Sequence, residues 1–308
     1  MGGILDRILG DLGDIALVGK LLSLPKADLN SLLMELLGRQ AGKISPQGLL
    51  KAYKSNRFTV PSEIDPVLYR TLESELLALG KENGFKAVLL SPASPLGSSS
   101  AFGYVNQNNV VSSLRGTETM PDPTNMLAII IASKLKGKEA ENFPDPLHYC
   151  ATTRVLRAQQ FPKTKGYYTH FGIFCIVSSG KDRGSYSCES ELLATQLGYY
   201  KQLLVQRYGA NLKVALSKRG GYADGDGFFA RMEHLVGEEL EDIPVSLDFA
   251  KENNNYYKGV SYKIFMEMDD GSQVEVGDGG FVDWIGQMTG NPKERCLISG
   301  IGLDRLLI

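Results

Sequence analysis

Apolar side chains recur every three or four residues through the first 58 positions, a spacing that predicts short amphipathic helices. Pro25 interrupts the pattern, and Ser45 ahead of Pro46 is placed to cap a later helix. From residue 59 onward, longer helical runs mix with strand-like alternation. We therefore predict a small N-terminal helical appendage over residues 1–58 and a core domain over residues 59–308.

The core alternates between helical and strand periodicity. Residues 68–79 place four leucines on one helical face, and the apolar run at 87–90 reads as a strand that Pro92 ends. Further strands are predicted at 110–114, 148–157, 167–178, 211–217, 260–268 and 273–276, with helices at 126–135, 189–204 and 228–240. This mixture indicates an α+β fold, with an antiparallel sheet of about six strands flanked by helices.

The composition is that of an ordinary globular protein, with 43% apolar and 22% charged residues. The net charge of −2 gives no electrostatic sign of a nucleic-acid-binding protein. No apolar run approaches the roughly 20 residues that cross a bilayer, and the N terminus lacks the features of a secretory signal. We expect a cytoplasmic protein without a membrane partner.

Cysteine and histidine spacing does not predict a metal site. The four cysteines form no Cys-x-x-Cys pair, and the three histidines lie far apart in the sequence. The cysteines expected to be buried free thiols are Cys150, Cys175, Cys188 and Cys296. Asp224 and Asp226 resemble the start of a calcium loop, but the later glutamate is missing, so we expect no bound metal.

The segment from residue 39 to residue 57 is basic. It carries five cationic side chains and no acidic one: Arg39, Lys43, Lys51, Lys54 and Arg57. One interpretation is a binding patch for RNA or an acidic partner. The other, which we favour, is the solvated face of a small helical appendage.

Glycines near the C terminus suggest a surface for a flat ligand. Gly279 and Gly280 end an alternating run, and Gly300 and Gly302 precede Arg305 after a buried strand. Glycine lets a ligand lie against bare backbone, and an arginine inside the next helix can reach a phosphate or carboxylate. The pattern is consistent with a flat surface on which a nucleotide would lie, or with a simple turn between a strand and a helix.

Two upstream positions carry candidate ligand contacts. Asp122 and Thr124 lie in a proline-punctuated loop before a buried helix, where Thr124 is a natural N-cap. Arg157 ends a predicted strand, and in a cleft it would stabilise a phosphate charge. The alternatives are a capped surface loop and a surface arginine. Farther on, Glu191 lies in the first turn of an acidic helix, where the helix dipole alone accounts for a carboxylate.

The order of these elements resembles the core of a class II aminoacyl-tRNA synthetase, most like the histidyl-tRNA synthetase branch. That branch also contains the regulatory subunit of ATP phosphoribosyltransferase. The resemblance covers residues 59–308 and implies that Arg157 contacts the α-phosphate and Arg305 the γ-phosphate of ATP. The segment at 84–92 looks like the family's motif 1, which implies a homodimer.

The resemblance also implies a substrate site. Asp122, in a loop similar to the family's Pro-acid-x-Thr loop, would hold a substrate amino group together with Thr124. Tyr256 and Tyr257 are similar to the tyrosine pair of the histidine loop. Gly279 and Gly280 match the family's double glycine, which lies beneath the substrate. The implied nucleotide-binding residues are Arg157, Gln159, Glu191, Gly300, Gly302 and Arg305.

Several departures from the family pattern argue against histidyl-tRNA synthetase activity. Gln159 replaces a glutamate near the adenine, Tyr167 replaces an arginine, and Glu252 stands where an arginine would neutralise the substrate carboxylate and α-phosphate. Losing one such charged donor typically costs roughly 3–4 kcal/mol of transition-state stabilisation. The sequence ends at Ile308, so we also expect no anticodon-binding domain.

We therefore predict a divergent paralogue that acts as a ligand-binding or regulatory subunit with a residual nucleotide or amino-acid pocket. The alternatives are an enzyme that adenylates an amino acid or another small carboxylic acid with ATP and Mg²⁺, and an RNA-binding protein that uses the segment at 39–57. The expected partners are a second copy of the chain and a small amino-acid or nucleotide ligand. A protein partner is a further alternative. The departures from the family pattern argue against tRNA as a partner.

Overall fold

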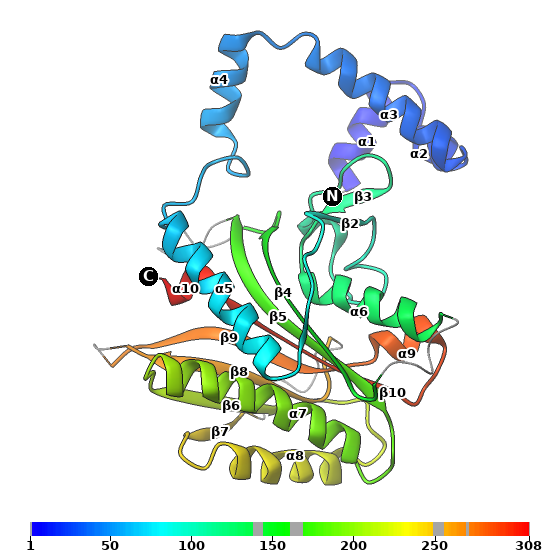
Figure 1. The fold of residues 1–308 in the computed structure, drawn as a ribbon. Helices are drawn as coiled ribbons and strands as arrows, with labels where there is room; N and C mark the ends of the chain where they lie inside the picture. The colour runs from blue at the N-terminus through cyan, green and yellow to red at the C-terminus, as the bar shows by residue number, and fades with distance from the viewer. Residues whose placement is uncertain (1, 138–143, 161–168, 249–255, 269–270, 308) are drawn as a thin grey trace.

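The computed structural model of the chain describes residues 2–137, 144–160, 169–248, 256–268 and 271–307. Its centre is a sheet of eight strands within these residues, in the order β1-β4-β5-β10-β9-β8-β6-β7 (Figure 1). The strands are β1 (Lys86–Ala87), β4 (Leu147–Leu156), β5 (His170–Lys181), β6 (Leu212–Lys218), β7 (Val245–Asp248), β8 (Lys258–Glu267), β9 (Gln273–Val282) and β10 (Glu294–Gly302). Only the edge pairs β1–β4 and β6–β7 are parallel.

Helices cover both faces of this sheet, which confirms the α+β prediction. One face carries α5 (Pro66–Glu82), α7 (Ser187–Tyr200) and α8 (Gly225–Glu239), and the other carries α6 (Pro123–Leu135) and α9 (Trp284–Thr289) (Figure 1). β5 supplies both cores because successive side chains point to opposite faces. Phe174 and Ile176 join the first core, and Cys175 and Val177 join the second.

The sheet has more strands than the predicted number of about six, because its shortest strands have too few residues to show a clear alternation. β7 was missed for this reason. The predicted strand at 87–90 is also shorter, since only Lys86–Ala87 is regular strand. Beyond it the amide of Val88 still donates to the Cys150 carbonyl oxygen, at 2.9 Å.

The predicted strand at 110–114 is wrong. Val110 and Ser112 make only isolated bridges, to Arg157 and Glu118 respectively. A small separate antiparallel sheet of two strands, β2 (Ala93–Pro95) and β3 (Thr117–Thr119), forms here instead. The amide of Ser113 donates to the Thr117 carbonyl oxygen. This segment therefore makes its backbone hydrogen bonds locally and not within the main sheet.

The N-terminal helices lead away from the main sheet and turn back, so that the N terminus lies near β2 and β3, as Figure 1 shows. They are α1 (Gly2–Asp11), α2 (Leu17–Leu22), α3 (Lys26–Ala41) and α4 (Pro46–Ser55), and we call them the helical arm. Ser45 caps α4 as predicted, since its hydroxyl oxygen accepts a bond from the Gly48 amide at 3.1 Å. None of the residues in α2, α3 or α4 is buried. Two contacts to the core are the bond from the Arg115 amide to Asn30 Oδ1 and the bonds of Arg57 described below.

The four cysteines are buried free thiols, as expected. Burial raises the pKa of the Cys150 thiol to about 12, so this group stays protonated and unreactive near neutral pH. Among the described residues, no three histidine, cysteine, aspartate or glutamate side chains are grouped to hold a metal ion. The described helices also include none that is long and apolar enough to cross a membrane.

Candidate functional site

A cavity of about 480 Å³ opens where the N terminus of α6 faces the sheet. The middle of β9 and β10 forms its floor, the ends of β4 and β5 form one side, and the loop at 97–109 contributes an outer wall. This volume is within the range of small-ligand sites, about 300–1,000 Å³. Nine of the predicted site residues line it: Asp122, Thr124, Arg157, Gln159, Tyr256, Tyr257, Gly300, Gly302 and Arg305.

Arg157 enters the cavity from the end of β4. Its position is fixed by a bridge to Val110 and by its amide, which donates to the Thr169 carbonyl oxygen at 2.9 Å. Its Nε donates to the carbonyl oxygen of Pro121 at 2.9 Å, and its guanidinium lies 5.2 Å from the centre of the Phe171 ring. The side chain is half-buried. The arginine predicted to contact phosphate is therefore held by protein acceptors on one side and open to the cavity on another.

Asp122 shares this wall with Arg157. One carboxylate oxygen, Oδ1, accepts bonds from the amide and the hydroxyl of Thr124, at 2.9 and 2.7 Å. The other, Oδ2, lies 3.6 Å from a guanidinium nitrogen of Arg157. The predicted N-cap was Thr124, and this is wrong: Asp122 caps α6, and Pro123 occupies the first helical position.

Two tyrosines stand between this wall and the floor. Tyr256 is hydrogen-bonded to Thr124 and packs edge-on against Trp284, with ring centres 5.4 Å apart. The hydroxyl of Tyr257 donates to Oδ2 of Asp278 at 2.7 Å. Burial is the main cause that raises the pKa of both tyrosines well above the usual value, so both are neutral hydrogen-bonding groups near pH 7.

Asp278 is a cavity residue that the sequence analysis missed. It lies on β9 opposite Gly300 of β10, and its side chain is reachable from the cavity mouth. The side chain is exposed at this point, and partial loss of surrounding water raises the pKa of its carboxylate above the usual aspartate value. The alternation of β9 contained the signal, because Asp278 and Gly280 share one face of the strand and Gly279 faces the other way.

Gly279 and Gly280 do not line the cavity, although they were predicted to lie beneath a substrate. A β-carbon on Gly280 would lie 2.5 Å from Cδ1 of Tyr257, so this glycine makes room for the tyrosine ring. A β-carbon on Gly279 would lie 2.6 Å from the Tyr262 hydroxyl oxygen, on the opposite face. The double glycine therefore positions two tyrosines, and only the ring of Tyr257 faces the cavity.

Arg305 lies at the far end of the floor, in the short helix α10 (Leu303–Leu306). Its guanidinium donates to the carbonyl oxygen of Glu275, and Gly302 is the N-cap of α10. Gly300 belongs to strand β10, which corrects the predicted turn at this point. Asp304 beside Arg305 is buried and accepts a bond from the Gly172 amide at 2.6 Å, so it anchors α10 to β5.

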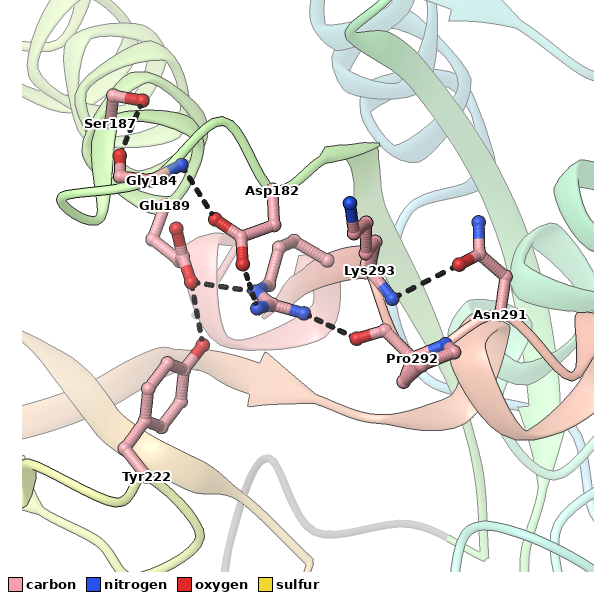
Figure 2. Close-up of polar contacts among 9 residues, drawn as sticks. Asp182, Gly184, Ser187, Glu189, Tyr222, Asn291, Pro292 and Lys293 are labelled. Atoms are coloured by element: carbon pink, nitrogen blue, oxygen red, sulfur yellow. Dashed lines mark hydrogen bonds and ion pairs between the residues drawn. The ribbon is translucent and has the colours of Figure 1, made fainter.

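Glu191 is separated from the cavity. It is exposed on α7 and pairs with Arg183, so the structure does not bring it to the other nucleotide-binding candidates. Its neighbour Glu189 is almost completely buried at 1% exposure. Nε of Arg295 donates to Oε1 of Glu189 at 2.7 Å, and Arg295 also pairs with Asp182 at 2.6 Å. Figure 2 shows Glu189, Asp182 and Tyr222 converging on this point, which joins α7 to β10.

The five cationic residues of the basic segment at 39–57 do not form one patch in the structure. Arg39 pairs with Glu35 on α3 at 2.6 Å. Arg57 donates to the backbone carbonyl oxygens of Ala158 and Gln159, on the rim of the cavity. The three lysines between them are exposed on the helical arm. The predicted positions Tyr167 and Glu252 lie outside the described residues.

The outer wall of the cavity depends on a buried carboxylate. Glu118, fully buried, accepts bonds from the Gly97 amide at 2.9 Å, the Ser98 hydroxyl at 2.7 Å and the Gln107 amide group at 2.8 Å. These bonds order the loop that presents Ser99 to the cavity. In the sequence Glu118 looks like an ordinary charge in a polar loop, so only its partners reveal its role.

The sheet order, the α6 loop and the C-terminal β10–α10 junction together define a class II aminoacyl-tRNA synthetase-like catalytic-domain fold. No protein-family model matches the chain, and no curated protein matches it. Similar solved structures include the apo histidyl-tRNA synthetase of S. aureus, at 17% identity and a TM-score of 0.59. The alignment covers 80% of this chain and 68% of that one.

Two further structures place the same fold in related proteins. The ATP phosphoribosyltransferase regulatory subunit/histidyl-tRNA synthetase of Bacillus halodurans is 16% identical with a TM-score of 0.58, over 80% of this chain and 81% of that one. The putative threonyl-tRNA synthetase ThrRS-1 of Aeropyrum pernix is 13% identical with a TM-score of 0.62, over 78% of this chain and 58% of that one. At these identities the likeness establishes the fold alone.

Proposed function

We propose that this protein binds a small amino-acid or nucleotide ligand in the cavity and acts as a binding or regulatory subunit. The observation that carries the proposal is the mixed charge of the cavity. Arg157 and Arg305 line it together with Asp122, Glu275 and Asp278. A zwitterionic ligand would find an oppositely charged partner for each of its ends, which a purely cationic or purely anionic surface would not offer.

Both arginines also have protein partners already. Arg157 donates to Pro121, and Arg305 donates to the Glu275 carbonyl oxygen. A triphosphate would have to compete with these acceptors and would lie near two or more carboxylates. The likeness to a structure named as a regulatory subunit supports the proposal at the level of the fold.

Adenylation of an amino acid or another small carboxylic acid is the alternative, with ATP and Mg²⁺ as cofactors. It is favoured by one specific observation: Arg157, at the end of β4, and Arg305, in α10, line the same cavity. Two guanidinium groups in one cavity are able to stabilise charge on a transferring nucleotide. In this alternative a carboxylate of the cavity, such as Glu275, would help to hold the metal ion.

The test combines binding with turnover. The full chain is titrated calorimetrically with the twenty amino acids and with ATP, and ATP–pyrophosphate exchange is measured with Mg²⁺ and the same amino acids. We expect saturable binding without exchange. Exchange with any amino acid would establish the adenylating alternative, and the absence of binding by all of these ligands would refute a small-ligand site.

A further inference from the structure

Four carboxylates line the cavity, and they differ in how many partners each already has. Glu275 pairs with Lys263, and Asp304 accepts a bond from the Gly172 amide and pairs with Arg154. Asp122 is satisfied, because Oδ1 caps α6 and Oδ2 faces Arg157 at 3.6 Å. Asp278 receives one bond, from the Tyr257 hydroxyl to Oδ2 at 2.7 Å. No described lysine or arginine forms an ion pair with Asp278. Of the four, Asp278 therefore has the most acceptor capacity to offer a ligand.

The groups around Asp278 leave it without a bound cation. Lys263 is its neighbour across the β8–β9 ladder, but the Lys263 ammonium group pairs with Oε2 of Glu275 at 2.5 Å. Glu275 and Asp122 both add negative potential at Asp278, and the positive potential from Lys263 is smaller than either. Tyr257 is neutral and donates a single hydrogen bond. A carboxylate in this setting is stabilised most by a cationic donor that comes from outside the chain.

The floor beside Asp278 is shaped to let such a donor approach. Gly300, directly opposite on β10, has no side chain to cover the carboxylate. Gly280, two residues farther along β9, seats the ring of Tyr257, which holds the tyrosine hydroxyl against Asp278. The carboxylate is thus held in one direction and open in another, as expected of a group that selects a ligand.

We infer that Asp278 is a specificity-determining residue and that the ligand is an amino acid with a second cationic nitrogen, such as an amino or guanidino group in its side chain. The inference rests on the proposed function and names the ligand class of that same site. The ligand carboxylate would lie toward Arg157 or Arg305, and the side-chain cation would contact Oδ1 of Asp278. The raised pKa of Asp278 agrees with this role, because a bound cation compensates the cost of keeping a partly desolvated carboxylate charged.

Matched ligands test the inference on the full chain. L-Lysine, L-ornithine and L-arginine are titrated calorimetrically against L-norleucine, which has nearly the shape of lysine without the charge. A charge-assisted hydrogen bond corresponds to about a 10- to 100-fold preference for the cationic ligand. Asp278→Asn keeps the shape of the side chain and should remove this preference, whereas Asp226→Asn, on an exposed carboxylate outside the cavity, should retain it.

The outcomes separate the inference from the proposed function. Preference for a cationic amino acid in the natural chain, and its loss in Asp278→Asn alone, would support the inference. Equal affinity for lysine and norleucine, or a preference that survives in Asp278→Asn, would overturn it and leave a small-ligand site standing. No binding of any amino acid or of ATP would overturn both.

Discussion

At the scale of single residues, the two cavity arginines make a direct prediction about nucleotides. Replacing Arg157 and Arg305 together with alanine should weaken any ATP binding at least about 100-fold, because each charged hydrogen bond contributes about 1.5–3 kcal/mol and 1.4 kcal/mol is a tenfold change. Isothermal titration calorimetry with and without Mg²⁺ measures the change. Arg183→Ala is the control, since that arginine is exposed and pairs with Glu191 outside the cavity. Undiminished ATP binding in the double variant would contradict the assignment of both arginines.

Asp278 makes a second prediction at this scale, concerning pH. Its pKa is raised in the folded chain, so the folded state binds more protons than the unfolded state between the two pKa values, and stability falls as pH rises through that interval. Asp278→Asn should therefore raise the melting temperature at pH 7, and the difference should shrink as pH falls through the raised pKa and be lost by about pH 4, the usual aspartate value. Scanning calorimetry at several pH values measures this.

Asp226 is a control carboxylate, for which we expect the opposite dependence of stability on pH. The pKa of Asp226 is lowered by its hydrogen bond to Lys218, so its contribution to stability is present at neutral pH and disappears on acidification. Asp226→Asn should leave the melting temperature at pH 7 unchanged or lower it. A melting temperature at pH 7 that falls in Asp278→Asn would show that its carboxylate stabilises the fold rather than serving a ligand.

At the scale of elements, the contact between α7 and β10 is a point of high stability. Arg295 neutralises Glu189, which is buried in the first turn of α7 (Figure 2). Arg295→Ala should lower the free energy of unfolding by about 3–5 kcal/mol, because it leaves a buried carboxylate without its cation. Urea unfolding measures the loss. Arg183→Ala removes an exposed ion pair next to the same helix and should cost less than about 1 kcal/mol; equal losses in the two variants would be evidence against a special role for Arg295.

The same helix shows what sequence patterns can and cannot predict. The helix dipole gives Glu189 and Glu191 the same explanation, yet one is buried against β10 and the other is exposed. The partner that distinguishes them, Arg295, is 106 residues away in the chain. Local periodicity predicted most helices and the long strands, because their regularity is local. The contacts of Asp278 and Glu118 depend on strand pairing and a loop path, which short-range patterns do not contain.

At the scale of the whole molecule, one edge of the sheet predicts an oligomer. β1 is an edge strand, and Leu89 just after it is 97% exposed. Val67 and Leu68, in the first turn of α5, are also exposed. An open edge beside exposed apolar side chains is a template for pairing with another chain. We predict a homodimer across this edge.

Leu89→Asp should weaken this dimer at least about tenfold, since burying a leucine contributes about 1.5–3 kcal/mol. Light scattering coupled to gel filtration over a concentration series measures the change. Leu247→Asp on β7, at the opposite edge, is the control and should leave the dimer intact. A natural chain that stays monomeric at all concentrations, or a Leu89→Asp variant that remains fully dimeric, would exclude this interface.

The sequence predicted the fold class of the sheet but not the order of its strands. The order of the motifs pointed to the class II synthetase-like fold, which the structural likenesses confirm. The cavity brings together nine of the predicted site residues because the fold places the start of α6, the end of β4, the residues before β8 and the β10–α10 junction around one space. Gly279 and Gly280 lie on β9 and make room for tyrosine rings instead of lining the cavity. This difference depends on which face of β9 each residue occupies.

The bonds from Arg57 to the rim of the cavity tie the helical arm to the site. Gln159, whose carbonyl oxygen accepts one of them, also lines the cavity. Two events that act on one shared contact are thermodynamically linked, and the linkage is reciprocal. Whatever free energy a ligand gains or loses by altering this contact, a partner that holds the arm gains or loses to the same extent. A ligand that changes this contact would therefore also change how tightly the segment after α4 holds to the core, although no residue of the four arm helices lines the cavity.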